Sequence, residues 1–264
     1  MNQKIKALID FLDGSKSVFH AVDLLKKKLE GEGYCALSEG EKWNLQKGGK
    51  YYMTRGGAAL IAFRIPNEVP TGFMLSAAHC DRPTFKVKEN GELNGTYTRL
   101  AVERYGGMLI STWLDRPLSV AGRVLVQTDR GMQSQLIDFA RPCAIIPNVA
   151  IHMNRKVNDG YTYDLAVDML PLYGGEAGTF RDAVAELAGC SADDILATDL
   201  YLYNPQPGVE WGEYISAPRL DDLQCAFASL EAFLTAPEAG NLPVYCLFDN
   251  EEVGSRTKQG AEST

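Results

Sequence analysis

His79 is the first residue of this sequence whose type and position suit metal chemistry. It begins the sequence His79-Cys80-Asp81, directly after the apolar run 73–78. In a His-x-Asp pattern the carboxylate can accept the imidazole N–H, which fixes the tautomer and raises the basicity of the other nitrogen. That nitrogen is then a good metal ligand, although a structural histidine at the end of a strand remains an alternative.

Two further pairs of carboxylates stand where elements begin or end. Glu251-Glu252 follows the apolar run 244–248. Two neighbouring carboxylates can divide the work, one binding a metal and the other acting as general base toward water, or they can form a solvated acidic turn. Asp221-Asp222 precedes a helical pattern, where an Asp can cap the helix or bridge two metals.

His152 is the third candidate position, in the sequence AIHMNR at 150–155. A packed or surface histidine is the ordinary interpretation there. Other catalytic patterns are missing: the sequence has no H-E-x-x-H, no G-x-S-x-G and no Walker lysine loop. This excludes a helix-borne zincin, a serine hydrolase with a nucleophile elbow and a P-loop nucleotidase.

The elements that must position these residues are α/β in character at both ends of the chain. Apolar spacing predicts helices near 5–12 and 22–29 and strands at 51–54, 58–64 and 72–78. The near-continuous apolar run 72–78 is typical of a strand buried on both faces. A helix over 222–234 and a strand over 242–248 follow.

Between these ends the sequence consists of short apolar runs separated by glycines, a pattern that predicts β structure with hairpins. The sequence therefore indicates an α/β domain interrupted by an inserted β-rich domain. We expect the α/β domain at 1–88 and 213–264, and the insert at 89–212.

Composition limits the partners and the compartment. The 264 residues contain 26 Lys and Arg against 34 Asp and Glu, a net charge of −8, which disfavours nucleic acid and anionic membranes as partners. The six cysteines form no C-x-x-C pair, as expected for free thiols in a reducing compartment. With no signal-peptide core and no apolar run near the roughly 20 residues of a membrane span, we expect a cytoplasmic protein.

Five segments together resemble the M18 aminopeptidases, the family of the aspartyl aminopeptidases and their bacterial relatives. They occur in the family's order and are SAAHCDRPTFK (76–86), WLDRPLS (113–119), AIHMNR (150–155), SAPRLDDL (216–223) and DNEEVGS (249–255). Each is weakly specific by itself, but five in order are very specific. The resemblance extends from Phe19 to the last residue.

The resemblance implies a role for each residue that matches a family motif. His79 would ligate one of two zinc ions, with Asp81 behind it. Asp221 would bridge both zincs, Glu252 would ligate zinc, and Glu251 would be the general base. By similarity the Asp221–Asp222 peptide bond is expected to be cis. Cys80 stands where the family usually has Thr.

The resemblance also implies assembly. Family members have a metallopeptidase α/β sandwich domain interrupted by a β-rich dimerisation domain, and their dimers commonly build dodecamers. The histidine that corresponds to His152 reaches into the active site of a neighbouring subunit, which would make it a catalytic residue there.

The expected function is removal of N-terminal residues, acidic ones by family preference, from peptides by a water activated between two zincs. Family chains continue beyond the Glu-Glu segment and supply another aspartate and a late histidine as ligands, so we expect this chain to be C-terminally truncated. The alternative is an inactive fragment that acts only as an oligomerisation module.

Overall fold

The computed structural model describes residues 3–174, 179–238 and 240–263, and the chain divides into two compact units. The first comprises Met1–Arg82 and Gln206–Thr264, and the second Pro83–Pro205. The boundaries predicted from the sequence, 88/89 and 212/213, lie a few residues beyond these limits. A mixed α/β unit with a β-rich intervening unit confirms the predicted fold class.

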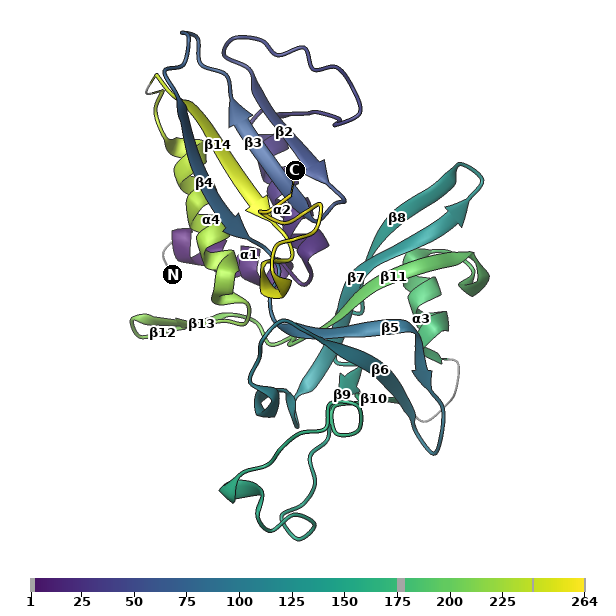
Figure 1. Ribbon diagram of the computed structural model, residues 1–264. Coiled ribbons are helices and arrows are strands. Elements are labelled where there is room, and N and C mark those ends of the chain that lie inside the picture. Colours follow the sequence, from purple (N-terminus) through teal and green to yellow (C-terminus); the bar gives the residue numbers. More distant parts are fainter. Residues whose placement is uncertain (1–2, 175–178, 239, 264) are drawn as a thin grey trace. The chain divides into compact units, whose positions relative to one another are not determined.

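The first unit combines helices with a five-stranded sheet of order β1-β2-β3-β14-β4 (Figure 1). Strands β14 and β4 are parallel, whereas β14–β3 and β2–β3 are antiparallel. A short hairpin, β12–β13, precedes the last helix. The elements are α1 (Gln3–Gly14), α2 (Val18–Gly31), β1 (Cys35–Ala36), β2 (Lys50–Arg55), β3 (Ala59–Arg64), β4 (Phe73–His79), β12 (Val209–Trp211), β13 (Tyr214–Ser216), α4 (Leu220–Thr235), β14 (Leu242–Phe248) and the 3-10 turn η4 (Glu251–Val253).

The helices of this unit bury one apolar stripe each. Ser17 caps α2, because its side chain accepts the backbone N–H of His20 at 3.4 Å. Leu12 of α1 and Leu25 of α2 are almost completely buried. Helix α4 is tied to the sheet through Tyr245, whose hydroxyl donates to the Ala226 carbonyl at 3.0 Å. The sheet and α4 therefore form one frame for the residues at their ends.

Strand β4 differs from its prediction. Its apolar run predicts burial on both faces, yet Phe73, Met74 and Leu75 are 72%, 56% and 68% exposed. The reason is position: among the described residues β4 is the last strand of the sheet and pairs with β14 alone. Burial sets in toward the carboxyl end of the strand, at Ala78.

The second unit is a β structure with the strand order β11-β5-β6-β10-β9-β7-β8, closed by an additional β11–β7 pairing. Helix α3 packs against β8. The elements are β5 (Thr84–Leu93), β6 (Thr98–Tyr105), η1 (Ile110–Trp113), β7 (Pro117–Thr128), β8 (Gly131–Asp138), β9 (Ala144–Ile145), η2 (Val157–Asp159), β10 (Leu172–Gly174), α3 (Thr179–Ala188), η3 (Ala192–Asp194) and β11 (Ile195–Tyr203).

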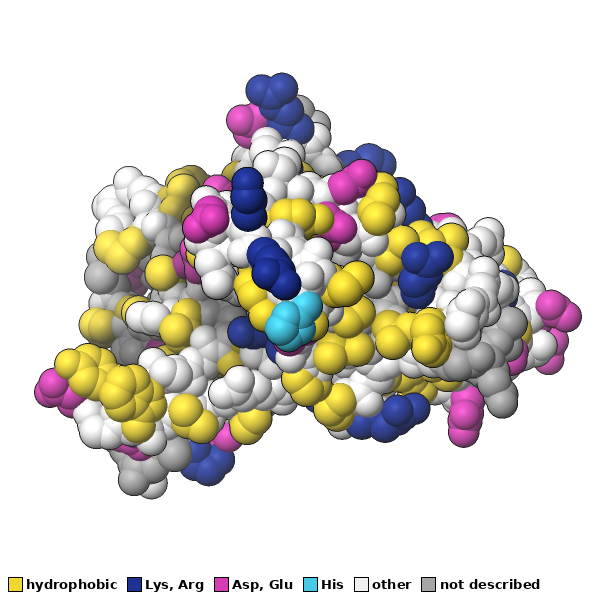
Figure 2. All heavy atoms as spheres, turned by 90° about the horizontal axis from the view of Figure 1, so that it is seen from below, with side chains coloured by type: hydrophobic (Ala, Val, Ile, Leu, Met, Phe, Trp, Pro, Cys, Tyr) yellow, Lys and Arg dark blue, Asp and Glu magenta, His cyan; other side chains and the backbone are white. Residues whose placement is uncertain are grey.

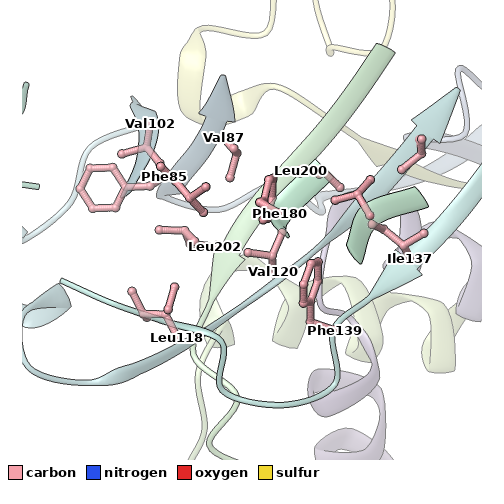
Figure 3. Packing of buried hydrophobic residues seen from close by; sticks show 14 of the residues in the cluster. Phe85, Val87, Val102, Leu118, Val120, Ile137, Phe139, Phe180, Leu200 and Leu202 are labelled. Atoms are coloured by element: carbon pink, nitrogen blue, oxygen red, sulfur yellow. The ribbon is translucent and has the colours of Figure 1, made fainter. Parts of the chain in front are cut away.

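This unit has a hydrophobic core of its own, in which side chains of β5, β7, β11 and α3 meet (Figure 3). Phe139 and Phe180 stack with ring centroids 5.8 Å apart. Gly122 lets β7 and β11 approach closely, since a Cβ there would lie 2.0 Å from the Asp199 carbonyl oxygen. No helix within the described part of the chain is long and apolar enough to cross a membrane.

Candidate metal centre

The carboxyl ends of β4 and β14 lie side by side. The parallel register pairs His79 with Phe248, and the Cys80 N–H donates to the Phe248 carbonyl at 2.9 Å. Asp81 follows β4 closely, and η4 with Glu251 follows β14. Sites in α/β proteins commonly form beyond such strand ends, and here two adjacent strands deliver an imidazole and carboxylates to one edge.

Asp81 joins the two strand ends and is fully buried. Its Oδ1 lies 3.1 Å from His79 Nδ1, and its Oδ2 accepts the backbone N–H of Glu252 at 3.0 Å. The Asp81 carbonyl oxygen also lies 3.1 Å from Nδ1. Since both neighbours of Nδ1 are acceptors, this nitrogen carries a proton, and Nε2 of the neutral ring is left to bind a metal.

The start of α4 meets the same edge. The Asp221–Asp222 peptide bond is cis, as the family resemblance predicts. Asp222 Oδ2 accepts the backbone N–H of His79 at 3.1 Å. This hydrogen bond ties the helix start to the end of β4, and it holds both aspartates beside the imidazole.

The His79 Nε2 atom faces three carboxylates. It lies 3.8 Å from Asp221 Oδ1, 3.9 Å from Asp222 Oδ2 and 3.9 Å from Glu251 Oε2. Ligand atoms of His79, Asp221 and Asp222 all lie within 4.8 Å of one another. The Asp221 and Glu251 side chains are 88% and 56% exposed, against 16% for His79. The centre is thus anchored at the imidazole and open to solvent at Asp221 and Glu251.

Negative charge dominates the electrostatics of the centre. Burial lowers the pKa of His79, but the hydrogen bond and charge of Asp81, with the charges of Asp222 and Glu251, outweigh it and raise the pKa to about 9. Burial, followed by the charge of Asp81, raises the pKa of Glu252. Both shifts reflect in part the negative charge that is crowded around the ring, and a bound cation would offset that charge.

Four of the residues singled out in the sequence are therefore neighbours: His79, Asp81, Asp221 and Glu251. Glu252 adjoins them through its backbone bond to Asp81, but its carboxylate is not part of the three-residue ligand group. That group includes Asp222, for which the sequence predicts no role separate from that of Asp221. The Asp222 side chain reaches the end of β4, where it accepts the backbone N–H of His79, a geometry that residue spacing does not reveal.

Two other positions are not members of this ligand group. The Cys80 thiol is buried and donates to the carbonyls of Ala58 and Phe248 at 3.2 and 3.3 Å, so it is not a substitute ligand. His152 lies in the second unit, exposed, in a segment with exposed Ile151 and Met153. On the face drawn in Figure 2, hydrophobic side chains are exposed among basic and acidic ones.

Fold and donor set together define an α/β protein with a candidate divalent-metal centre. Its residues 11–264 match the family described as Aminopeptidase I zinc metalloprotease (M18), and the chain belongs to this family. One imidazole nitrogen and several carboxylate oxygens are ligands that zinc accepts. The residues present at the centre therefore fit the metal that the family's description names.

Individual relatives agree with this assignment. The chain is 42% identical over 281 residues to a probable M18 family aminopeptidase 2 of Clostridium novyi, with 100% of this chain and 65% of the relative covered. It resembles the structure of Chaetomium thermophilum mApe1 with a TM-score of 0.89 and 32% identity, covering 98% of this chain and 65% of that one. For the S. cerevesiae mApe1 dodecamer the TM-score is 0.84 at 28% identity, with coverages of 97% and 62%. The chain thus spans just under two thirds of the length of these proteins.

Proposed function

We propose that this chain carries part of the active site of a metalloaminopeptidase that removes N-terminal residues from peptides. The observation that carries the proposal is the His79 imidazole, held by buried Asp81 and facing the carboxylates of Asp221, Asp222 and Glu251 within 4 Å. The names of the matched relatives, probable M18 family aminopeptidases, support the reaction class.

Two zinc ions are proposed as the cofactor. His79, Asp221 and Glu252 would hold them, with Asp221 between the two, and Asp222 is close enough to contribute. When bound, zinc supplies Lewis-acid chemistry: it lowers the pKa of a water and stabilises negative charge on a carbonyl oxygen. The excess of carboxylates around one imidazole supports the proposal of two divalent cations, whose positive charge would offset the negative charge of the carboxylates.

Proton transfer is assigned to Glu251. Its carboxylate lies 3.9 Å from His79 Nε2 and is more than half exposed, so it can reach an attacking water and later the leaving amine. It would take the proton from the first and deliver it to the second. Asp81 would hold the His79 ring in its tautomer, and the Asp222 bond to the His79 backbone would keep the ring in place.

A free α-amine on the substrate would pair with a carboxylate of the centre, and this pairing would confine cleavage to the first residue. Acidic N-terminal residues are the proposed substrates, by the family resemblance. His152 is proposed to act in the site of a neighbouring subunit, which requires self-association through the second unit. One solved relative is described as a dodecamer. All six cysteines are free, which supports a reducing compartment such as the cytoplasm.

The test is hydrolysis of peptides that begin with Asp or Glu, assayed by release of the free amino acid. Glu251→Gln keeps the shape and size of the side chain but removes the base, and we expect it to lower kcat at least about 100-fold while the zinc content is unchanged. Glu213→Gln, at an exposed position of the β12–β13 turn, is the matched control and should keep full activity.

Chelation should abolish the activity, and zinc should restore it. Cleavage that survives complete removal of metal would contradict the proposal. The alternative, an oligomerisation module without catalysis, predicts oligomers of the unsubstituted chain that bind no zinc and release no amino acid.

A further inference from the structure

We propose that the free edge of β8 is a contact between two copies of this chain, in which β8 of each copy pairs antiparallel about a two-fold axis at Ser134. This names a surface for the proposed self-association and rests on that part of the proposed function. It is independent of the metal centre.

The backbone of β8 presents unused hydrogen-bonding groups on one side. Strand β8 is the last strand in the order of its sheet, so within the described part of the chain it pairs with β7 alone (Figure 1). The Phe139 N–H donates to the Val120 carbonyl at 3.0 Å. Val120 and Phe139 are therefore a hydrogen-bonded pair at the end of the β7–β8 ladder. Hydrogen-bonded and non-hydrogen-bonded pairs alternate in an antiparallel ladder. The N–H and C=O groups of Met132, Ser134 and Leu136 therefore point away from β7.

Apart from Asp138 at its end, β8 lacks the features that keep edge strands from pairing with one another. Natural edges are protected by charges, prolines or bulges, but residues 131–137, Gly-Met-Gln-Ser-Gln-Leu-Ile, include no charged residue and no proline. The β7–β8 register runs without a shift from Ala121↔Asp138 to Thr128↔Gly131. Residues 132–136 are exposed, with Met132 and Leu136 exposed by 64% and 38%. A straight, neutral and partly apolar edge favours addition of another strand.

The side-chain order makes a second β8 the matching partner. A two-fold axis at Ser134 places Ser134 opposite its copy, Gln133 opposite Gln135, and Met132 opposite Leu136. Every outward backbone group then meets one from the other copy, giving about six hydrogen bonds. The exposed apolar side chains also meet on one face of the joined sheet, where directly opposed pairs stabilise each other.

Neighbouring registers are less favourable. Only residues whose backbone groups point outward can form hydrogen bonds across the contact, and these are every second residue of β8. The pairing can therefore shift only by two residues at a time, which moves the two-fold axis by one residue. An axis at Gln133 would place Leu136 opposite Arg130, and an axis at Gln135 would place Met132 opposite Asp138. Both alternatives pair an apolar side chain with a charge, so Ser134 is the favoured centre.

Cysteine cross-linking of the whole chain tests the register. In Ser134→Cys the two thiols would be directly opposed, with Cα atoms about 5.5 Å apart, inside the range for a disulfide. We expect mild oxidation to give a covalent dimer of twice the 29.0-kDa chain mass on a non-reducing gel. Gln127→Cys, on the neighbouring strand β7, and the unsubstituted chain, with its native cysteines, are the controls and should stay uncross-linked.

Charge variants test the same pairing without a new bond. Met132→Lys/Leu136→Lys and Met132→Glu/Leu136→Glu each oppose like charges across the axis, and each should associate at least about tenfold more weakly in analytical ultracentrifugation. An equimolar mixture of the two should associate again, because Lys then faces Glu. Circular dichroism should show that both variants remain folded.

The proposal is overturned if Ser134→Cys gives no dimer beyond the controls, or if the folded charge variants associate like the unsubstituted chain. Loss of the cross-link while the chain still self-associates would refute the β8 contact and leave the proposed assembly standing. Absence of any self-association would refute both. Aminopeptidase activity that fails to appear would refute the reaction class without touching the β8 contact.

Discussion

Asp81 links the two halves of the candidate centre through one buried side chain. One carboxylate oxygen fixes the His79 ring, and the other holds the backbone of Glu252. A buried carboxylate without partners would be costly, so these bonds also explain why the charge is tolerated. Asp81 alone thereby positions both His79, a proposed metal ligand, and the segment that carries Glu251, the proposed base.

Replacing Asp81 by Asn removes the negative charge of the side chain but keeps its shape. We expect Asp81→Asn to weaken zinc binding by roughly 10–100-fold, because the amide still reaches Nδ1 but no longer raises the basicity of the ring. Competition with a coloured zinc chelator measures the affinity, and His79→Ala provides the reference for a lost ligand. Unchanged affinity in folded Asp81→Asn would remove its proposed role behind His79.

Among the elements, parallel pairing of β4 and β14 brings residues 79 and 251 together although they are far apart in the sequence. In the second unit, Asp199 fastens β11 to its neighbours, since its carboxylate accepts bonds from Arg123 of β7 at 2.6 Å and Lys86 of β5 at 2.9 Å. Burial raises the pKa of Asp199. The two hydrogen bonds and the positive charges of Arg123 and Lys86 together lower it by more than burial raises it, so the pKa lies below its ordinary value.

This bond network predicts a pH-dependent cost for Asp199→Asn. At pH 7 the substitution should lower the free energy of unfolding by about 1–3 kcal/mol. Because the folded pKa is depressed, the contribution is complete above the unfolded pKa of about 3.9 and is lost as the pH falls through the folded pKa. Urea unfolding of both proteins at pH 7 and below pH 4 should therefore show a difference that shrinks on acidification.

A matched control is Asp193→Asn, an exposed position in η3, which directly precedes β11. It should change the free energy of unfolding by less than about 0.5 kcal/mol at either pH. A difference for Asp199→Asn that stays constant between the two pH values would show that the carboxylate charge is not what holds β11.

For the whole molecule, the central expectation is that His152 serves the active site of another subunit. If so, His152→Ala and Glu251→Gln, each inactive alone, should complement each other in mixed oligomers. In a random equimolar mixture of dimers, about a quarter of the sites would receive both intact residues. The measurement is aminopeptidase activity after mixing under conditions that allow subunit exchange.

The control is each variant mixed with itself under the same exchange conditions. If the mixture of the two variants is no more active than these controls although mass spectrometry shows mixed oligomers, His152 does not act across subunits.

The sequence by itself determined the α/β class with a β-rich insert, and it singled out most of the residues that the structure brings together at the candidate centre, because apolar periodicity and short motifs are local signals. It also predicted the helix at the start of which Asp221 lies and the strand that precedes Glu251. The predicted burial of residues 73–75 was wrong. The exposure of a side chain depends on which strands flank its own strand, and among the described residues β4 pairs on one side only.

Only the tertiary structure decided how the ligands are arranged. It brought Asp222 to His79 through a backbone bond, divided the two oxygens of Asp81 between His79 and Glu252, and turned the Cys80 thiol away from the centre. It also determined which backbone groups of β8 face outward. These features depend on contacts between residues distant in the chain, whose geometry follows from strand pairing and packing rather than from residue spacing.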